Sequence, residues 1–345
     1  MYAISYANRL RRSTTDSRDA CGDSSSPEAC ENGSMRIVFA GTPEFAVPSL
    51  LALAGPGQHA SHEVVGVLTR EDAPLGRKRV LTPSPVARAA AELGLPVHKA
   101  NRLDEAATEW ARGLRAELGV IVAYGGLVRE PLLSLPEHGW INLHFSELPA
   151  WRGAAPVQRA LMAGEQRLGV TVFRLVEALD AGDVLTRGLR DFEPGTSAGD
   201  ALAELASFGT DALLEAVRLL ETHPGAGEPQ LGEASYAHKL SREDGRLDLA
   251  APATRVLAHW AGVTPEPGAF ALHEGQPLKM LELRATDDVT AGEDRRAGIA
   301  RLADGRAILG LDGGSLELLR VQPAGKPPMA GADWLRGRGG EAVLS

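Results

Sequence analysis

The sequence predicts an α/β protein in which a doubly wound, mostly parallel sheet is followed by a small antiparallel β-barrel. Two observations predict this order. Between residues 36 and 145, short apolar runs alternate with segments of helical spacing, as in parallel strands joined by crossover helices. Beyond residue 269 the apolar runs are short and Asp-Gly pairs separate them, as in antiparallel hairpins. With 345 residues, the chain has room for two domains, each with its own core.

The composition is that of a globular protein, with 44% hydrophobic and 23% charged residues. No apolar run approaches the roughly 20 residues that a membrane-spanning helix needs, so we expect no membrane contact. The net charge of −9 argues against a general nucleic-acid coat, although local cations can still contact phosphate groups. Both cysteines, Cys21 and Cys30, lie near the N-terminus. We therefore expect a reducing, cytoplasmic setting with no Cys-rich metal site and no Cys nucleophile.

The chain divides at two compositional changes. Residues 1–34 are polar and unpatterned, so we expect a disordered extension or a start assigned too early, with Met35 opening the folded protein. A Pro- and Gly-rich stretch after residue 222 predicts a linker. The expected parts are a first domain over 35–223, the linker over 224–235 and a second domain over 236–345.

The first strand is expected over residues 36–40, where the chain is continuously apolar. Gly41, Thr42 and Pro43 follow, which predicts that Thr42 caps a helix that begins at Pro43. Backbone N–H groups at such a turn can bind an anion, and a purely structural turn is the alternative. The G-x-G-x-x-G pattern is absent, so we do not expect a dinucleotide.

A cluster of cations follows the second expected strand, which covers residues 64–68. Arg77, Lys78 and Arg79 lie between bends marked by glycine and proline. Such a cluster is commonly a solvated loop. Its place after the C-terminal end of a strand favours the alternative, contact with an anionic ligand.

Two helices and a third strand complete this part of the sheet. Helical spacing covers residues 84–93 and 104–118, with Gly94 and Gly119 as stop signals. A buried strand is then expected over residues 119–124.

The strand expected over residues 140–145 carries Asn142 and His144. Because strand side chains alternate with a period of two, both point to the same face. Pro149 and Gly153 follow, so the pair lies where the strand runs into a loop. A carboxamide there can hold a developing oxyanion, and an imidazole can move a proton. A structural Asn-x-His pair is the alternative.

Two further strands, over 169–174 and 184–189, flank a turn that contains Asp180, and a long helix is expected over 197–221. A carboxylate that hydrogen-bonds one imidazole nitrogen fixes the tautomer and stabilises the charged ring, which would join Asp180 to His144. A plain turn residue is the alternative. Because no activated Ser or Cys accompanies the set, direct transfer to an incoming nucleophile fits better than a covalent intermediate.

The second domain is expected to be a small barrel of a kind that often binds oligonucleotides. Asp304-Gly305 and Asp312-Gly313 are the hairpin signals. A zinc site is not expected, because no H-E-x-x-H motif or Cys pair accompanies His138 and His144. The short extended segments are residues 269–272, 277–283, 298–302, 307–311 and 315–321.

Several motifs between residues 35 and 345 resemble those of the methionyl-tRNA formyltransferases, which are 10-formyltetrahydrofolate-dependent formyltransferases. The loop that begins at Trp151 is the most specific of these motifs. The Asn142, His144 and Asp180 set is shared by all formyltransferases that use this folate. The motifs are residues 36–45, 122–125, 142–144, 148–158, 179–183 and 321–326.

The resemblance implies a Rossmann-like catalytic domain and an OB-like second domain. It implies direct transfer of the formyl group of 10-formyltetrahydrofolate to the α-amine of methionyl initiator tRNA, through a tetrahedral intermediate. Asn142 would steady the oxyanion. His144, oriented by Asp180, would move protons between the amine and the departing folate nitrogen. We expect a monomer that needs no metal.

The resemblance also assigns residues to the two substrates. The barrel should follow the tRNA backbone. The residues expected at the folate are Val122, Tyr124, Gly125, Ser146, Glu147, Leu148 and Pro149. Those expected at the tRNA are Gly41, Thr42, Arg77, Lys78, Arg79, Trp151 and Arg152.

Two positions depart from the family pattern: Phe145 stands where many members have Gly, and Glu147 where Leu is common. Phe145 would narrow the pocket, and Glu147 adds a carboxylate beside the folate turn. One rival hypothesis is a formyltransferase for a nucleotide sugar or glycinamide ribonucleotide, which the Trp151 loop, the cation cluster and the barrel disfavour. The other is a non-catalytic folate- or nucleotide-binding module, for which His144 would be dispensable.

Overall fold

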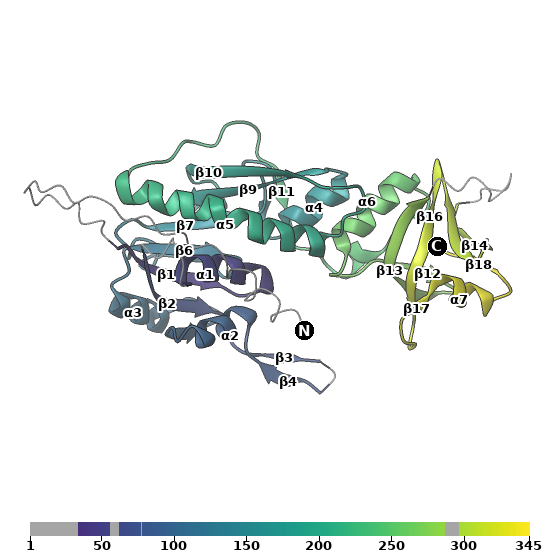
Figure 1. The fold of residues 1–345 in the computed structure, drawn as a ribbon, viewed down its shortest axis with the longest axis horizontal. Coiled ribbons are helices and arrows are strands. Elements are labelled where there is room, and N and C mark those ends of the chain that lie inside the picture. Colours follow the sequence, from purple (N-terminus) through teal and green to yellow (C-terminus); the bar gives the residue numbers. More distant parts are fainter. Residues whose placement is uncertain (1–33, 56–61, 77, 287–296) are drawn as a thin grey trace, which may run out of the picture. The chain divides into compact units, whose positions relative to one another are not determined.

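The computed structural model describes residues 34–55, 62–76, 78–286 and 297–345. Its first part is built on a seven-stranded sheet with the order β10-β9-β7-β6-β1-β2-β5 (Figure 1). β1 pairs in parallel with β2 and β6, and β6 with β7, whereas β9 is antiparallel to β7 and β10. The predicted mostly parallel sheet is confirmed. Its strands are β1 (Arg36–Gly41), β2 (Glu63–Thr69), β5 (Val97–Lys99), β6 (Leu118–Val122), β7 (Trp140–His144), β9 (Arg167–Arg174) and β10 (Val184–Asp191).

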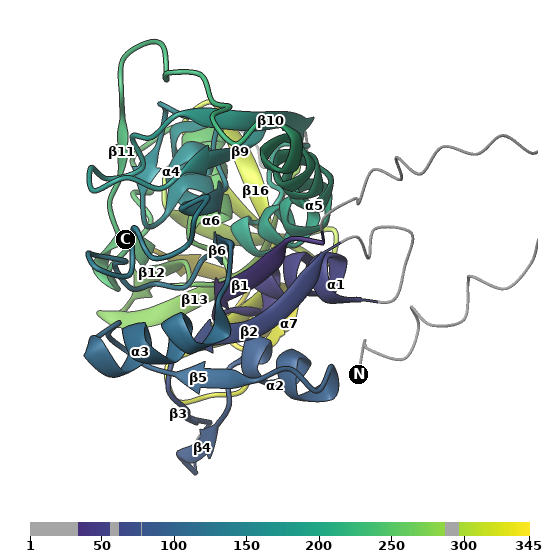
Figure 2. The ribbon, with the colours of Figure 1, turned by 90° about the vertical axis from the view of Figure 1, so that its left-hand side faces the viewer.

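Helices cover both faces of this sheet, which explains why β1 is buried from Ile37 onward and β6 is buried along its whole length. Figure 2 shows α1 and α5 together on one side of the strands, and these two helices pack against each other. Ala111 of α3 packs on the opposite face, with Val38 and Ala40 of β1. The helices are α1 (Val47–Ala54), α2 (Pro85–Glu92), α3 (Glu105–Leu114), α4 (Pro156–Ala163) and α5 (Ala198–Thr222).

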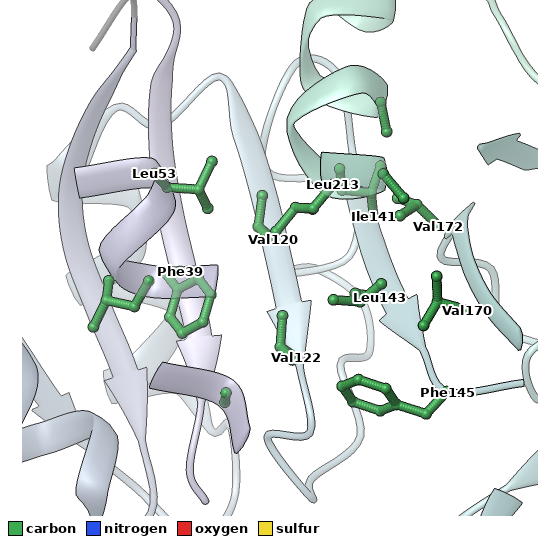
Figure 3. Packing of buried hydrophobic residues seen from close by; sticks show 14 of the residues in the cluster. Phe39, Leu53, Val120, Val122, Ile141, Leu143, Phe145, Val170, Val172 and Leu213 are labelled. Carbon is green, nitrogen blue, oxygen red and sulfur yellow. The ribbon is translucent and has the colours of Figure 1, made fainter. Parts of the chain in front are cut away.

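The alternation of side chains along β7 sets the position of the polar pair. Ile141 and Leu143 point into the core shared with α1 and α5, close to Leu213 of α5 (Figure 3). Asn142 and His144 therefore point to the other face. The predicted common face of these two side chains is confirmed.

Two local predictions in this domain are wrong. Thr42 does not cap a helix, because its hydroxyl donates to the Tyr124 carbonyl at 2.9 Å and a short 3-10 turn, η1 (Glu44–Ala46), precedes α1. The helix expected over residues 104–118 ends at Leu114, because Arg115 adopts a left-handed conformation with φ of 51°. Leu118 instead begins β6.

The segment that carries the cation cluster folds into a hairpin of β3 (Ala73–Leu75) and β4 (Val80–Thr82). Leu75, Val80 and Leu81 on this hairpin are exposed. Because neither face of this hairpin is buried, its sequence shows no alternation of apolar and polar residues. The sequence analysis therefore predicted only a loop here.

The last part of the chain is a nearly closed antiparallel barrel with the order β12-β13-β16-β15-β14-β18, with β17 paired to β16. Leu272 and Ser345 exchange two backbone hydrogen bonds, which bring the two edges of this sheet together. The predicted antiparallel barrel is confirmed. Its strands are β12 (Phe270–His273), β13 (Gln276–Thr286), β14 (Ile299–Ala303), β15 (Arg306–Leu311), β16 (Gly314–Pro323), β17 (Met329–Ala330) and β18 (Glu341–Val343).

Two helices that the sequence analysis did not identify pack on the barrel. α6 (Ala253–Val263) and α7 (Gly331–Arg336) bury Trp260 and Trp334 in the barrel core. α6 also packs against α4. Across the sheet, the buried Glu317 carboxylate accepts hydrogen bonds from Arg284 and Arg306 on the neighbouring strands, both at 2.7 Å. No helix in the described ranges is both long and apolar enough to cross a membrane.

Candidate functional site

A cavity of about 650 Å³ lies where β1, β6 and β7 end. Its wall includes Pro43 after β1, Ala123 after β6 and Phe145 after β7. Crevices at the carboxyl ends of strands are the usual ligand sites of such sheets. The loop after β9 and a segment near residue 237 complete the wall.

The three polar residues singled out from the sequence all line this cavity: Asn142, His144 and Asp180. Asn142 is half-buried, while His144 and Asp180 are buried. The Asp180 carboxylate lies 4.0 Å from Nδ1 of His144. Strand β7 supplies two members and a loop from beyond β9 supplies the third, so the tertiary structure brings the set together.

The bond that fixes the imidazole differs from the one predicted. Asp180 is too far from His144 for a hydrogen bond, because the Oδ2 to Nδ1 distance is 4.0 Å. The Nε2 N–H of His144 instead donates to the Trp151 backbone carbonyl at 2.9 Å. A carbonyl oxygen can only accept, so the neutral ring carries its proton on Nε2. Nδ1 is then free to receive a proton and faces the carboxylate.

The electrostatics of His144 combine opposing effects. Burial lowers the pKa of the imidazole below its usual value, while the Asp180 charge and the Trp151 carbonyl raise it. Burial dominates, so the ring is neutral near pH 7. A neutral imidazole with a carboxylate nearby is a base whose protonated form is stabilised as soon as it forms.

A backbone N–H holds the Asp180 carboxylate. Gly153 donates to Oδ2 of Asp180 at 2.7 Å. Gly153 has a φ of 122°, and a side chain there would meet the Ala237 carbonyl oxygen at 2.8 Å. Glycine is therefore required at this position, because it alone allows both the conformation and the close approach. The short strand β8 (Arg152–Gly153) is held by β11 (Tyr236–Ala237) from beyond the linker.

The residues expected at the folate fall into two groups. Tyr124 and Gly125 line the cavity, and the Tyr124 hydroxyl donates to the Ala100 carbonyl. Val122 is buried at the end of β6 and does not line the cavity. The turn Ser146, Glu147, Leu148 and Pro149 does not line it either.

Internal hydrogen bonds explain the position of that turn. The Ser146 hydroxyl donates to the Ala150 carbonyl at 2.6 Å. The Thr171 hydroxyl donates to the Ser146 carbonyl and accepts the Leu148 N–H. The turn therefore does not border the cavity itself. It connects to Phe145 on one side and leads to Arg152 on the other, and both of these residues line the cavity.

The residues expected at the tRNA are more scattered. Arg152 lines the cavity, whereas Gly41, Thr42 and Trp151 do not. The indole N–H of Trp151 donates to Glu165 at 3.0 Å. Lys78 and Arg79 are exposed between β3 and β4, and Arg77 lies outside the described residues.

Phe145 lines the cavity and is buried, and its ring meets Phe45 edge-on with the centroids 5.5 Å apart. Figure 3 shows Phe145 beyond the end of β7, beside Val122. The side chain therefore narrows the cavity and at the same time closes the end of the core.

Sequence reasoning missed several contributors to the wall. The chain after the linker supplies Tyr236, His238 and Lys239, and the loop after Tyr124 supplies Leu127 and Val128. No sequence signal marked these residues: Leu127 is a single exposed apolar residue, and such residues are common on protein surfaces. Within the residues that the structure describes, no three His, Cys, Asp or Glu side chains gather as a metal site would need.

Comparison with known proteins agrees with this architecture. A model of the formyl transferase family matches residues 35–217, and one of the formyl transferase C-terminal domain matches residues 239–339. A methionyl-tRNA formyltransferase of Leifsonia xyli is 55% identical over 316 residues, which cover 90% of this chain and 100% of that protein. One of Clavibacter sepedonicus is 52% identical and covers 88% of this chain and 97% of that protein.

A solved structure shares the fold at much lower identity. The N-formyltransferase of Helicobacter canadensis, in complex with folinic acid and dTDP-3-aminofucose, superimposes with a TM-score of 0.61 at 15% identity. It covers 84% of this chain and 99% of that one. The matching family models and the close relatives together assign the protein: this chain belongs to the formyl transferase family.

Proposed function

We propose that this chain transfers the formyl group of 10-formyltetrahydrofolate to the α-amine of methionyl initiator tRNA, which gives N-formylmethionyl-tRNA for translation initiation. The observation that carries the proposal is the convergence of Asn142, His144 and Asp180 on one cavity. Relatives at 55% and 52% identity that bear the name methionyl-tRNA formyltransferase support the choice of acceptor.

The reaction begins with attack by the amine nitrogen on the formyl carbon. Esterification makes this amine less basic than that of free methionine, so a neutral nucleophile is available near pH 7. As the new N–C bond forms, the formyl oxygen becomes an oxyanion, and the Asn142 carboxamide donates a hydrogen bond to it. Oxyanion donors of this type lower the activation barrier by roughly 3–4 kcal/mol.

His144 then handles the proton that the attacking nitrogen must lose. Its Nε2 N–H is engaged by the Trp151 carbonyl, so Nδ1 accepts the proton, directly or through water. Asp180, at 4.0 Å, stabilises the imidazolium. Collapse of the tetrahedral intermediate breaks the bond from the formyl carbon to the folate nitrogen, and the same proton passes to that nitrogen. Tetrahydrofolate leaves and the ring returns to its neutral form.

The cavity suits the folate in size and character. Its volume of about 650 Å³ falls within the range of small-molecule sites, roughly 300–1,000 Å³. Tyr124, Gly125, Leu127 and Val128 offer an apolar wall for the pterin. The turn from Ser146 to Pro149 supports the pocket from behind rather than lining it.

The acceptor end of the tRNA would enter from the side of Arg152, which borders the cavity. Arg77, Lys78 and Arg79 would contact phosphate groups of the acceptor stem, and the barrel would follow the backbone. These contacts predict that tRNA affinity falls with salt although the whole chain is acidic, because only local cations release counterions.

The setting of the protein is also part of the proposal. It would act as a monomer in the cytoplasm, with residues 35–223 as the catalytic domain, 224–235 as the linker and 236–345 as the tRNA-binding domain. Light scattering tests the oligomeric state, and a stable dimer would contradict this part of the proposal.

One assay tests the function. Purified full-length chain is incubated with 10-formyltetrahydrofolate and charged initiator tRNA, and formyl-methionine is scored. Parallel reactions offer an amino sugar nucleotide or glycinamide ribonucleotide as acceptor. Formylation of the tRNA alone is expected; transfer to either small acceptor instead would favour the rival enzymes. No formylation of any acceptor, together with folate binding that His144→Ala leaves unchanged, would favour a non-catalytic binding module.

A further inference from the structure

The carboxamide of Gln230, in the expected linker, makes four hydrogen bonds next to the site. Its Nε2 donates to the Asp180 carbonyl at 2.8 Å and to the Gly182 carbonyl at 2.9 Å. Its Oε1 accepts from Arg152, at 3.2 Å from Nε and 2.6 Å from Nη2. Two donors and two acceptor positions are the full capacity of this side chain. Gln230 is only half-buried, so water could satisfy its carboxamide; the four protein hydrogen bonds therefore indicate a structural role.

The loop that Gln230 holds runs from the end of β9 to the start of β10. Its ends are fixed, because the Leu175 N–H donates to the Trp140 carbonyl at 2.7 Å and the Asp183 carbonyl accepts from the Arg174 N–H at 2.8 Å. At its centre the backbone is held more weakly, since Ala181 donates to the Ala178 carbonyl at a long 3.4 Å. Asp180 sits in this loop in a left-handed conformation, with φ of 46°. Asp adopts such a backbone more readily than most residues other than glycine, so this conformation alone implies little strain. The two Nε2 bonds grip the backbone carbonyl of Asp180 and the one two residues further on.

The Oε1 atom of Gln230 binds Arg152, which belongs to the segment that contacts the Asp180 carboxylate from the other side. Arg152 directly precedes Gly153, and the Gly153 N–H is the group that donates to Oδ2 of Asp180. Gln230 therefore bridges the two segments that meet at this carboxylate: the Asp180 loop and strand β8. Gly182 adds a constraint, because a side chain there would lie 1.9 Å from the Arg174 carbonyl oxygen, so the loop has one tight path.

We propose that Gln230 is a positioning residue for formyl transfer: its carboxamide fixes the Asp180 carboxylate at the distance from His144 at which it stabilises the imidazolium. Gln230 itself does not border the cavity. This inference rests on the proposed function. It adds that the expected linker contributes a positioning residue, and that this residue affects kcat although it lies outside the cavity.

The test compares Gln230→Ala and Gln230→Glu with the wild-type full-length chain. Gln230→Ala removes all four bonds, and we expect kcat to fall roughly 10- to 100-fold with the KM for each substrate within about threefold. Gln230→Glu keeps the length and the bonds from Arg152, but it places an oxygen against the two carbonyls. It should lose a similar factor in kcat while its melting temperature stays near that of the wild type.

A pH profile separates positioning from general loosening. Of the charged side chains in the described chain, Asp180 is the one that acts on the His144 ring, and its effect raises the ring pKa. Displacing the carboxylate therefore lowers this pKa and moves the acid limb of kcat to lower pH. A merely structural loss would lower the plateau without moving the limb. Gln166→Ala, an exposed glutamine between α4 and β9, is the matched control and should leave kcat and the limb unchanged.

The outcomes are distinct. Reduced kcat with unchanged KM values and a shifted limb supports the proposal. Gln230→Glu with wild-type kcat overturns it, as does a Gln230→Ala protein whose acid limb coincides with that of the wild type. A wild-type chain that does not formylate charged initiator tRNA would defeat the proposed function instead, so the two failures cannot be confused.

Discussion

The backbone carbonyl of Trp151 accepts the Nε2 N–H of His144 at 2.9 Å, and this bond determines which ring nitrogen remains to take up a proton. The side chain of Asp180 then faces that free nitrogen, Nδ1, at 4.0 Å. A main-chain atom thus sets the tautomer and a carboxylate sets the stability of the charged form. The division of roles gives direct predictions for the kinetics.

The first prediction concerns pH. Burial lowers the pKa of His144 below its usual 6.5. In the proposed mechanism the neutral ring is the base, so kcat should fall as pH drops through this lowered pKa. Asp180→Asn removes the charge that raises the pKa, so its acid limb should lie at lower pH and its plateau should also be reduced. The substrate amine titrates equally in both reactions, so the difference between the two profiles reports the ring. An unchanged or higher limb for Asp180→Asn would contradict the model.

The second prediction concerns the oxyanion. Asn142→Ala should reduce kcat by roughly 10²–10³-fold, because the carboxamide acts on charge that appears only in the transition state. The KM for folate and for tRNA should change little, and steady-state kinetics with each substrate varied checks this. Asn101→Ala removes an exposed carboxamide that donates to Glu71 and serves as the control. A large rise in the folate KM with unchanged kcat would assign Asn142 to binding instead.

The third prediction concerns tRNA contacts. Arg77→Ala should raise the KM for charged tRNA, leave the KM for folate unchanged and reduce the slope of log affinity against log salt by about one. The control is Arg112→Ala, an exposed cation on α3 that pairs with Glu109. Equal losses for both substrates would speak against a role for Arg77 in tRNA binding.

The fourth prediction concerns the stability of the barrel. Hydrogen bonds from Arg306 and Arg284 hold the pKa of Glu317 below its usual value. A carboxylate with a lowered folded-state pKa stabilises the protein above its unfolded-state pKa, and this contribution is lost as pH falls through the folded-state pKa. Glu317→Gln should lower the free energy of unfolding by about 1–3 kcal/mol at pH 7.

Urea unfolding at several pH values measures this difference. It should shrink in acid, where the wild-type carboxylate is itself protonated. Glu282 is an exposed carboxylate 3.4 Å from Arg320, and its substitution Glu282→Gln should change the free energy of unfolding little at any pH. A difference for Glu317→Gln that stays constant with pH would mean that its charge is not the source of the stability.

The fifth prediction concerns Phe145. Phe145→Ala should reduce the free energy of unfolding by about 3–5 kcal/mol, because the ring closes the end of the core against Phe45. Formyl transfer should continue with a folate KM within a few fold of the wild type, since the polar set remains. Chemical denaturation and folate titration measure the two effects. Unchanged stability would show that the ring does not contribute to the core.

Most regular elements of the first domain were predictable because their patterns are local. The strands of the main sheet other than the three-residue β5, which was not predicted, contain short apolar runs. α5 has a capping serine at residue 197 followed by helical spacing. The placement of Asn142 and His144 on one face follows from the period of the strand alone. The hairpin β3–β4 and the short helices α4 and α6 gave no comparable pattern.

The remaining part of the site could not be predicted for a physical reason. The Trp151 carbonyl and the Gly153 N–H are main-chain groups of a kind that nearly every residue has, so the sequence does not mark them. Gln230 and Tyr236 reach the site from far along the chain. Their contacts depend on tertiary packing, which residue spacing does not encode.

The pairing of β8 with β11 has a consequence for how this architecture can be dissected or recombined. A fragment that ended at Thr222 would keep the three polar residues but would lack the strand that holds Gly153 in place. A graft of the first domain onto a different C-terminal module would need to carry the following chain as far as Lys239. The unit that can be transplanted intact is therefore longer than the domain that contains the chemistry.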